Sequence, residues 1–200
     1  MSSFHVLLSV SEQLRQTLWG AIHDDPGTRN LLASEMDLVF TNPTETARRR
    51  SSTNKLSMWL YQITENEYLK NQPPLRGNGH TSQQDPPLAL NFSYLITPFG
   101  PTDGSPDAEL LLLGKVMQVM YDNPTLFVQS PADNVFEELR VILCRLSLEE
   151  LTRVWEALRE PYRLSICYQV RVTRVDSSRI AQKARVVQAD HDYGNTLEES

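Results

Sequence analysis

Serine, histidine and carboxylate side chains are the residues of this 200-residue sequence that could carry hydrolytic chemistry. Ser9, Ser57 and Ser93 lie outside the Gly-x-Ser-x-Gly context that exposes a nucleophilic hydroxyl on a strand-to-helix turn. The histidines are scattered along the chain, at His5, His23, His80 and His191. A nucleophilic or acid–base set would therefore have to be assembled by folding from distant segments. The sequence predicts a binding or structural protein without catalytic residues and without a cofactor.

Two short segments place a histidine beside aspartates, which are groups that a metal ion could use as ligands. They are His23-Asp24-Asp25 and Asp190-His191-Asp192. The first is expected at a turn and the second in a polar tail, where solvated side chains are the usual outcome. No metal site is therefore predicted. Cys144 and Cys167 lie in apolar, strand-like stretches without a Cys-x-x-Cys motif, and they are predicted to be buried free thiols.

Arg48, Arg49 and Arg50 form the one dense run of charge in the sequence. Such a run could bind an acidic protein face or nucleic acid. Ser51 and Ser52 follow it, in place of the aromatic side chains that would stack on bases. The chain has 19 basic and 25 acidic residues, a net charge of −6 and a pI near 5.2, which argues against a general phosphate-backbone binder. A solvated loop and a protein contact remain as interpretations, and no nucleic-acid partner is predicted.

Composition indicates a folded chain rather than a disordered or membrane-spanning one. Hydrophobic residues make up 40% and charged residues 22% of the sequence, and a chain of this length buries about 70% of its unfolded surface without a disulfide. The longest apolar run, Leu110 to Leu113, is far shorter than the ~20 residues of a membrane span. The first residues lack the basic region of a secretory signal. We therefore expect a soluble protein made in the cytoplasm, with no direct membrane insertion.

Hydrophobic periodicity divides the chain into helices and strands. Helices are predicted over 4–22, 107–122 and 148–158, and strands over 36–40, 55–64, 88–97, 126–129, 138–146 and 164–175. The segment 71–87, which is rich in Pro and Gly, is predicted to be a long loop. This order predicts an α+β (mixed α/β) fold with a mainly antiparallel sheet and about three helices packed on it. We expect a single domain over 1–176 and a partly flexible tail over 177–200.

The same patterns predict which faces are buried. In the strand over 88–97, large apolar residues alternate with small or polar ones, so one face is expected to meet the core. The apolar stripe of the helix over 107–122 consists of Leu110, Leu113, Gly114, Met117, Met120 and Tyr121. Ser147 and Glu150 have the spacing of a capping box, which predicts that a helix begins between them.

Five stretches of the sequence follow one another in a recognisable order. They are Pro87-Leu-Ala-Leu-Asn-Phe-Ser-Tyr-Leu-Ile-Thr97, Glu109-Leu-Leu-Leu-Leu-Gly114, Met117 to Asp122 with Asn123-Pro124, Leu148-Glu-Glu-Leu-Thr-Arg-Val-Trp-Glu-Ala-Leu158 and Pro161-Tyr-Arg-Leu-Ser-Ile-Cys-Tyr-Gln-Val170. Together they resemble the N-terminal domain of the cap proteins of contractile injection systems, which are phage-tail-like particles. The resemblance covers residues 4–175, and the order and spacing of the motifs carry it rather than any one of them.

The resemblance implies a non-enzymatic tail terminator that caps the inner tube and the surrounding sheath as a homohexameric ring. The implied partners are other copies of the chain, the tube protein, the sheath protein and, where a second cap protein shares the end, that protein. The implied fold is the mixed α/β fold of phage tail terminator subunits. The motif residues are expected to be architectural, with Trp155 and Tyr168 in the core, Gly114 at a close helix–sheet contact and Pro161-Tyr162 at a fixed turn.

Partner contacts are therefore expected on loops and in the C-terminal tail, which tolerate irregular polar sequence. The candidates are Arg48, Arg49, Arg50, Arg76 and His80. The particle is expected to be assembled in the cytoplasm and then either released or anchored to a membrane. Two other hypotheses stay open. One is a neck, connector or tail-completion protein of a phage-like particle, and the other is an enzyme whose site is assembled from distant residues.

Overall fold

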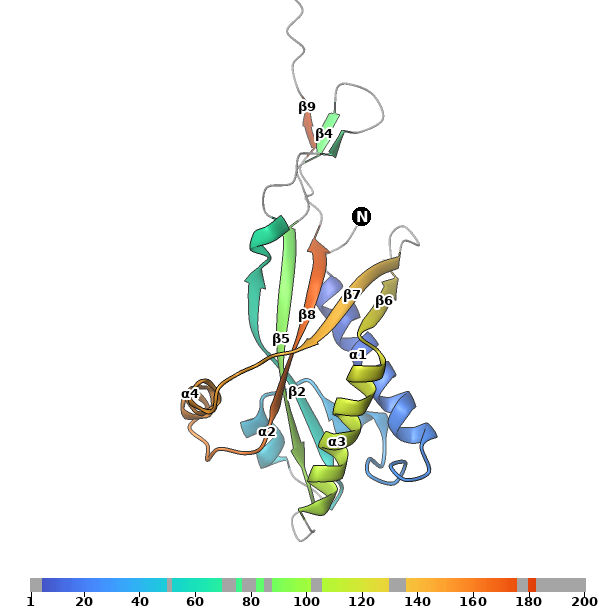
Figure 1. The fold of residues 1–200 in the computed structure, drawn as a ribbon, viewed down its shortest axis with the longest axis vertical. Helices are drawn as coiled ribbons and strands as arrows, with labels where there is room; N and C mark the ends of the chain where they lie inside the picture. Colours follow the sequence, from blue (N-terminus) through green and yellow to red (C-terminus); the bar gives the residue numbers. More distant parts are fainter. Residues whose placement is uncertain are drawn as a thin grey trace, which may run out of the picture. The chain divides into compact units, whose positions relative to one another are not determined.

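The computed structural model divides the chain into two compact units, which we describe separately (Figure 1). The larger unit comprises Met1–Asn71 and Pro87–Asp176, and the smaller unit comprises Gln72–Pro86 and Ser177–Ser200. The structure describes residues 5–49, 52–69, 75–76, 82–84, 88–101, 106–129, 136–175 and 180–182.

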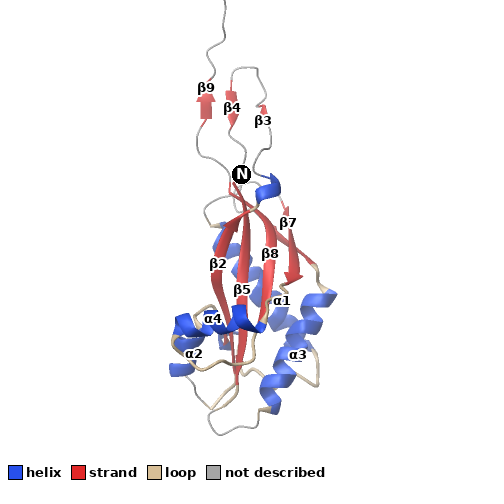
Figure 2. Cartoon of the chain, turned by 60° about the vertical axis from the view of Figure 1, so that its left-hand side comes forward, coloured by secondary structure: helices blue, strands red, loops and turns tan. Residues whose placement is uncertain are grey.

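A six-stranded sheet forms the centre of the larger unit (Figure 2). The helices and strands of this unit are α1 (Val6–Asp24), β1 (Leu38–Val39), α2 (Pro43–Arg48), β2 (Lys55–Glu65), β5 (Leu88–Phe99), α3 (Asp107–Asp122), β6 (Thr125–Gln129), β7 (Phe136–Leu143), α4 (Leu148–Leu158) and β8 (Ile166–Val175). The strand order is β1-β2-β5-β8-β7-β6, and every neighbouring pair is antiparallel except β1 with β2. The predicted fold class, a mixed α/β fold with a mainly antiparallel sheet, is confirmed.

In the smaller unit, β3 (Leu75–Arg76), β4 (Ser82–Gln84) and β9 (Ile180–Gln182) form a three-stranded antiparallel sheet. The prediction of a long loop over 71–87 is therefore wrong at β3 and β4. These strands are only two and three residues long, which is too short for an alternating pattern to show in the sequence.

Helices α1 and α3 bury their apolar stripes against one face of the six-stranded sheet. The stripe of α1 recurs at intervals of four residues and consists of Val6, Val10, Leu14, Leu18 and Ile22. These side chains belong to one buried cluster with residues of β5, β6, β7, β8 and α3. The helix predicted over 4–22 is confirmed with a shift of two residues at each end.

Strand β5 is buried on both faces, which corrects the expectation of a single core face. Phe92, Tyr94 and Ile96 point into the main cluster, and the alternate residue Leu95 is also fully buried. A register shift between Leu90 and Asn91 interrupts the alternation along the strand. Burial raises the pKa of Tyr94 to about 12, and its hydroxyl lies 3.0 Å from the Ser11 hydroxyl.

The bounds predicted for α3 are confirmed, but the predicted stripe is wrong. The buried residues of α3 are Leu112, Leu113, Val116, Val119 and Met120. Four of the six residues predicted to form its stripe are exposed instead, and they are Leu110, Gly114, Met117 and Tyr121. Four consecutive leucines over 110–113 fit two different helix faces equally well, so the periodicity alone does not choose between them. Nothing lies within 4 Å of the place that a Cβ on Gly114 would occupy, so the expected close helix–sheet contact at this glycine is also wrong.

The strand predicted over 36–40 is shorter than expected. A 3-10 helix occupies Glu35–Asp37, and only Leu38–Val39 form β1. Ser34 and Asp37 form a capping box, in which the Ser34 side chain accepts from the Met36 N–H and Asp37 accepts from the Ser34 N–H. Side-chain hydrogen bonds of this kind compete with a strand ladder, which is the physical reason for the short strand.

An ion pair joins the end of α1 to the middle of α3. The Lys115 Nζ lies 2.6 Å from the Asp25 Oδ2, and the Gly27 N–H donates to the Asp25 Oδ1 at 2.8 Å. The hydrogen bond from Lys115, followed by that from Gly27, lowers the pKa of Asp25 below its ordinary value of 3.8. The carboxylate form is therefore the form that the folded state favours.

We expect Asp25→Asn to reduce the loss of unfolding free energy that the protein shows as the pH falls. Because the pKa is lower in the folded state, this stabilisation is present above the unfolded pKa and is lost as the pH falls through the folded pKa. Urea unfolding at about pH 6 should show the variant less stable than the wild type, and the difference should vanish near pH 2. A constant difference across this range would contradict the expectation.

Candidate interaction surfaces

Helix α4 lies away from the sheet, and extended connections join it to β7 before it and to β8 after it (Figure 1). At its start the Ser147 side chain accepts from the Glu150 N–H, and the Glu150 side chain accepts from the Ser147 N–H at 2.7 Å. The predicted capping box is therefore confirmed, and the bond from the Ser147 N–H lowers the pKa of Glu150. The helix ends at Arg159, which has the left-handed conformation common at helix C-termini, with φ 56°.

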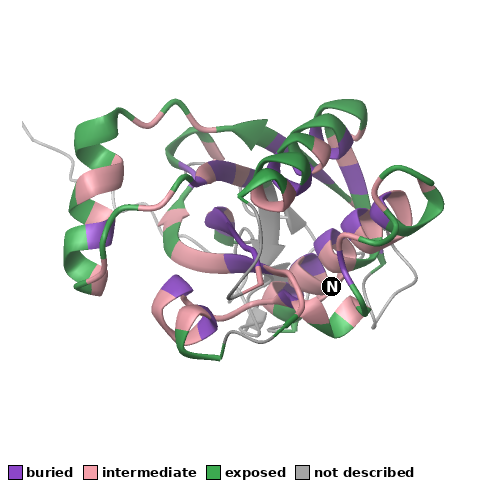
Figure 3. Cartoon of the chain, turned by 90° about the horizontal axis from the view of Figure 1, so that it is seen from below, coloured by how far each residue is buried: buried purple, intermediate pink, exposed green. Residues whose placement is uncertain are grey.

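The apolar face of α4 is only partly covered by its own unit. The face consists of Leu148, Leu151, Val154, Trp155 and Leu158. Of these residues only Trp155 is buried, and Leu148 is 65% exposed. Figure 3 shows the same for the helix as a whole, because most of the α4 ribbon is coloured exposed or intermediate. A helix of 11 residues is marginal on its own in water. Trp155 is therefore the main anchor that holds α4 to the larger unit.

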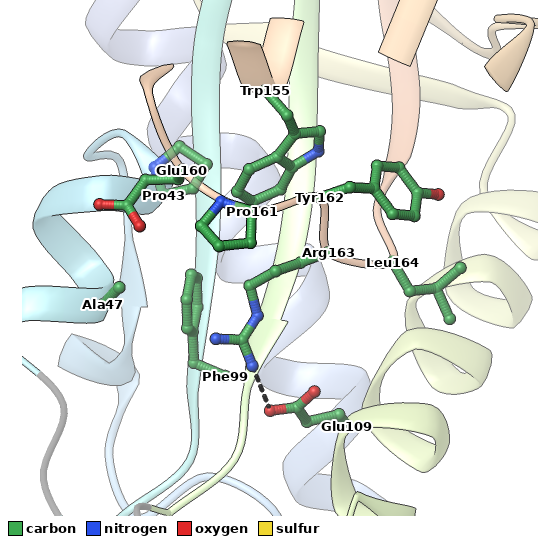
Figure 4. A pocket seen from close by; sticks show the side chains of 10 residues that line it. All are labelled: Pro43, Ala47, Phe99, Glu109, Trp155, Glu160, Pro161, Tyr162, Arg163 and Leu164. Carbon is green, nitrogen blue, oxygen red and sulfur yellow. Dashed lines mark hydrogen bonds and ion pairs between the residues drawn. The ribbon is translucent and has the colours of Figure 1, made fainter. Parts of the chain in front are cut away.

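A pocket of about 490 Å³ lies beside Trp155, between α4, α2 and the end of β5 (Figure 4). Its lining residues are Pro43, Ala47, Phe99, Glu109, Trp155, Glu160, Pro161, Tyr162, Arg163 and Leu164. The Trp155 indole packs edge-on to the Tyr162 ring, with the ring centroids 6.3 Å apart. Trp155 is only 2% exposed, and Tyr168 is also buried, so the prediction that both lie in the core is confirmed.

Two charged residues of this pocket, Glu109 and Arg163, hold the segment that follows α4. The Arg163 Nη2 lies 3.2 Å from the Glu109 Oε1, and the guanidinium lies over the Phe99 ring at 4.8 Å from its centroid. The Gly100 N–H donates to the same Glu109 oxygen at 2.7 Å. These contacts tie three separate segments together, so the pair serves as a structural clamp. Within the described residues, no group of three or more His, Cys, Asp or Glu side chains could hold a metal ion.

The two cysteines are free thiols, with Cys167 in β8 and Cys144 directly after the neighbouring strand β7. The Cys144 N–H donates to the Cys167 carbonyl at 2.8 Å, and the Tyr61 hydroxyl lies 3.3 Å from the Cys167 Sγ. Cys167 is buried, as predicted, and Cys144 is half-buried. The hydrogen bond with Cys144 and burial raise the pKa of Cys167, and burial raises the pKa of Tyr61. Cys167 is therefore held as the neutral thiol, which is the unreactive form.

The structure places the arginine run at the end of a short helix rather than wholly in a loop. Arg48 is the last residue of α2 and is exposed. The Arg49 Nη2 pairs with the Glu45 Oε1 at 3.1 Å, and the Arg49 carbonyl accepts a hydrogen bond from the Lys55 ammonium at 2.8 Å. The signal for α2 was in the sequence, because Asn42 caps the helix through the Glu45 N–H and Pro43 occupies the first turn.

The remaining candidate contact residues are not described in full. Arg50 and His80 lie outside the described residues, and so does the side chain of Arg76, which belongs to β3 in the smaller unit. Sequence reasoning also missed the exposed apolar residues of α3. The four consecutive leucines allow a second stripe on this helix, but the spacing alone does not say which of the two stripes is exposed.

Comparison with known proteins identifies the fold. A family model described as the Pvc16 N-terminal domain matches residues 9–189. The cryo-EM structure of the PVC sheath/tube terminator, from an extracellular contractile injection system in its extended state, is similar with a TM-score of 0.57 and 18% identity over 94% of this chain. The tube-terminating cap of the anti-feeding prophage, also determined by cryo-EM, is similar with a TM-score of 0.60 and 18% identity over 91% of this chain.

These two structures are longer than the present chain, which spans 65% of the first and 59% of the second. At 18% identity the likeness shows a shared fold. A search of curated proteins finds no match to this sequence. The mixed α/β unit built around the six-stranded sheet is therefore a fold found in terminators of contractile injection systems.

Proposed function

The chain belongs to the Pvc16 N-terminal domain family, and from that premise we propose that it is a structural cap. In this proposal it terminates the inner tube and the surrounding sheath of a phage-tail-like contractile injection particle, as a homohexameric ring. The observation that carries the proposal is the fold, which matches two terminators over more than nine-tenths of this chain. The partners are other copies of the chain, the tube protein, the sheath protein and any second cap protein at the same end.

We further propose that the protein works by binding and has no catalytic activity. The pocket beside Trp155 supports this, because its Glu109 and Arg163 contact each other, Gly100 and Phe99. Both groups are thus committed to holding the segment after α4 in place. A terminator needs complementary surfaces rather than a reactive group, and the exposed faces of α3 and α4 and the exposed Arg48 supply such surfaces.

Location follows from the same proposal. Within the described residues, no helix combines the length and the apolar character that crossing a bilayer requires. The particle is assembled in the cytoplasm and is then released or anchored by other components. The net charge of −6 means that attraction to acidic partners depends on local basic groups such as Arg48 and Arg49.

A neck or connector protein of a phage-like particle is the second candidate. It would form the same kind of ring but would have different neighbours. Imaging of purified particles that carry a tagged copy of this chain separates the two functions. A cap places the tag at the last layer of tube and sheath with nothing beyond it, whereas a connector places it between the tube and a further structure.

We expect the purified protein to stop elongation when it is added to polymerising tube protein from the same particle. Because a terminator binds only the growing end, mean tube length in negative-stain micrographs should fall as the ratio of cap to tube protein rises. Gold-labelled cap protein should be found at tube ends. Labels spread along the tube walls, or an unchanged length distribution, would contradict the proposed function.

A further inference from the structure

Two helices of the larger unit carry apolar residues that their own unit covers only in part. One is α3, whose outward face carries exposed apolar side chains. The other is α4, in which Trp155 is the one buried residue. Figures 1 and 2 both show the two helices as separate elements at different positions around the sheet. Each copy of the chain therefore presents two different apolar helix faces to its surroundings.

The open face of α3 is a stripe of exposed residues in which a glycine lies between the larger side chains. Leu110, Gly114, Met117 and Tyr121 follow one another at steps of four, three and four residues, which places them on one line along the helix. Leu110 is 56% and Tyr121 84% exposed. Nothing lies within 4 Å of a Cβ built on Gly114. The glycine therefore leaves a hole between Leu110 and Met117 into which the side chain of a partner helix can fit.

The open face of α4 matches this stripe in length and character. From Leu110 to Tyr121 the α3 stripe is about 16.5 Å long, and from Leu148 to Leu158 helix α4 is about 15 Å long. Leu148 projects from α4 as an exposed knob, and Leu151, Val154 and Leu158 are half-buried beside it. Helices with apolar faces of similar length pack by inserting side chains of one between those of the other.

The charges at the ends of the two helices are complementary. Asp122 is exposed at the C-terminal end of α3, where the helix dipole is negative and the last turn holds no basic residue. Arg159 is exposed at the C-terminal end of α4. Lys115 of α3 is already paired with Asp25 and does not offset this acidic end. A parallel arrangement of the two helices brings Arg159 of one copy to Asp122 of another.

We propose that the apolar face of α4 in one copy of this chain docks on the Leu110–Gly114–Met117–Tyr121 stripe of α3 in the next copy. The contact is head-to-tail, because the two faces differ, and head-to-tail contacts that close by rotation make rings. The inference rests on the proposed function in one respect, which is that the assembly closes into the ring of a cap. It assigns to Gly114 an intermolecular role instead of a contact within its own unit.

The first test is the mass of the full chain and of two face variants by analytical ultracentrifugation, up to about 100 µM, where even weak specific contacts are populated. The wild type should self-associate. Leu110→Asp with Met117→Asp, on α3, and Leu148→Asp, on α4, should each weaken association about tenfold or more. Leu8→Asp, at another exposed apolar position on a helix, and Glu156→Lys, on the polar face of α4, are the matched controls and should assemble as the wild type does.

The second test uses the head-to-tail nature of the contact. The variant with substitutions on α3 keeps an unchanged α4 face. The variant with the substitution on α4 keeps an unchanged α3 face. An equimolar mixture of the two should therefore form heterodimers, although each variant alone associates about tenfold or more weakly than the wild type. A symmetric contact through one shared face would not give this rescue, so failure of the mixture to dimerise overturns the inference.

Gly114→Gln is a third variant, in which α3 is expected to stay folded, so that a loss of association is not due to unfolding of the helix. Gln is a better helix former than Gly and would project into open space, so the melting temperature should be equal to or above that of the wild type. The filled hole should weaken association about tenfold. Unchanged association in this variant overturns the inference, and so does a wild type that stays monomeric.

The tube-length assay separates this inference from the proposed function. If the wild type shortens tubes but assembles through another surface, the helix contact is wrong and the cap function stands. If the wild type forms the helix-mediated assembly but leaves tube length unchanged, the contact stands and the cap function is wrong.

Discussion

Trp155→Ala should detach α4 from the larger unit while the six-stranded sheet stays folded. Trp155 is the buried residue of this helix, and its ring contacts Tyr162 beside Pro43 and Phe99 in the pocket. Removing a buried Trp side chain costs about 3–5 kcal/mol. Trp155 lies outside the main cluster that joins α1 and α3 to the sheet, so we expect the loss to fall on the docking of α4.

Hydrogen exchange measured by mass spectrometry is the suitable readout. Amides of α4 should exchange about a hundredfold faster in Trp155→Ala, because the freed helix is too short to persist in water. Amides of β5 should keep their protection. Trp155→Phe is the matched control, since the buried Nε1 finds no hydrogen-bond acceptor in the described part of the chain and the phenyl ring keeps much of the contact. Equal protection of α4 in the alanine variant and the wild type would contradict this expectation.

Local side-chain chemistry is the part of this fold that the sequence predicts well. The start of α4 follows from Ser147 and Glu150, whose reciprocal hydrogen bonds involve residues three apart in the chain. The end of α3 follows from Asn123-Pro124, because a residue before proline is disfavoured in the helical conformation. Such signals need no knowledge of the tertiary structure.

The choice of buried face depends on packing partners that are distant in the sequence. In α3 the leucine run allows two phases, and the sheet and α1 select the one that buries Leu112 and Val116. Leu95 of β5 is buried on the face opposite to the main cluster, although polar neighbours on its own strand suggested an open face there. Neither result can be derived from spacing along the chain.

The candidate contact residues also divide into those that local sequence predicts and those that depend on tertiary packing. The pairing of Arg49 with Glu45 could be predicted, because residues four apart on a helix are neighbours. The exposure of Leu110, Met117 and Tyr121 could not, because it depends on the face that α3 turns to the sheet. An apolar residue at helical spacing is ordinarily assigned to the core, and this assignment fails where a helix offers a second apolar face.

Reversing the charge at Arg48 and Arg49 should abolish particle assembly without unfolding the domain. Arg48 is exposed at the end of α2, and Arg49 pairs only with the half-exposed Glu45 among the described residues. Arg49→Glu places two glutamates four residues apart, which costs only about 0.2–0.5 kcal/mol. If these guanidinium groups face an acidic surface of the tube or sheath, Arg48→Glu with Arg49→Glu turns attraction into repulsion. Particles counted by electron microscopy after complementation of a deletion strain measure the loss.

The control for this prediction must make the same change in net charge at another site. Arg140→Glu with Arg171→Glu does so, because both residues are exposed and face each other across β7 and β8. Each pair of exchanges lowers the net charge from −6 to −10, since every exchange replaces one positive charge with one negative charge. If the two double variants lose assembly equally, general repulsion between acidic subunits explains the loss and the arginine run has no special role. If only the Arg48 and Arg49 variant fails, while its melting temperature stays near that of the wild type, the loss is local to α2. Raised salt should then also weaken wild-type assembly, because the Debye length falls from about 8 Å at physiological ionic strength to about 3 Å at 1 M.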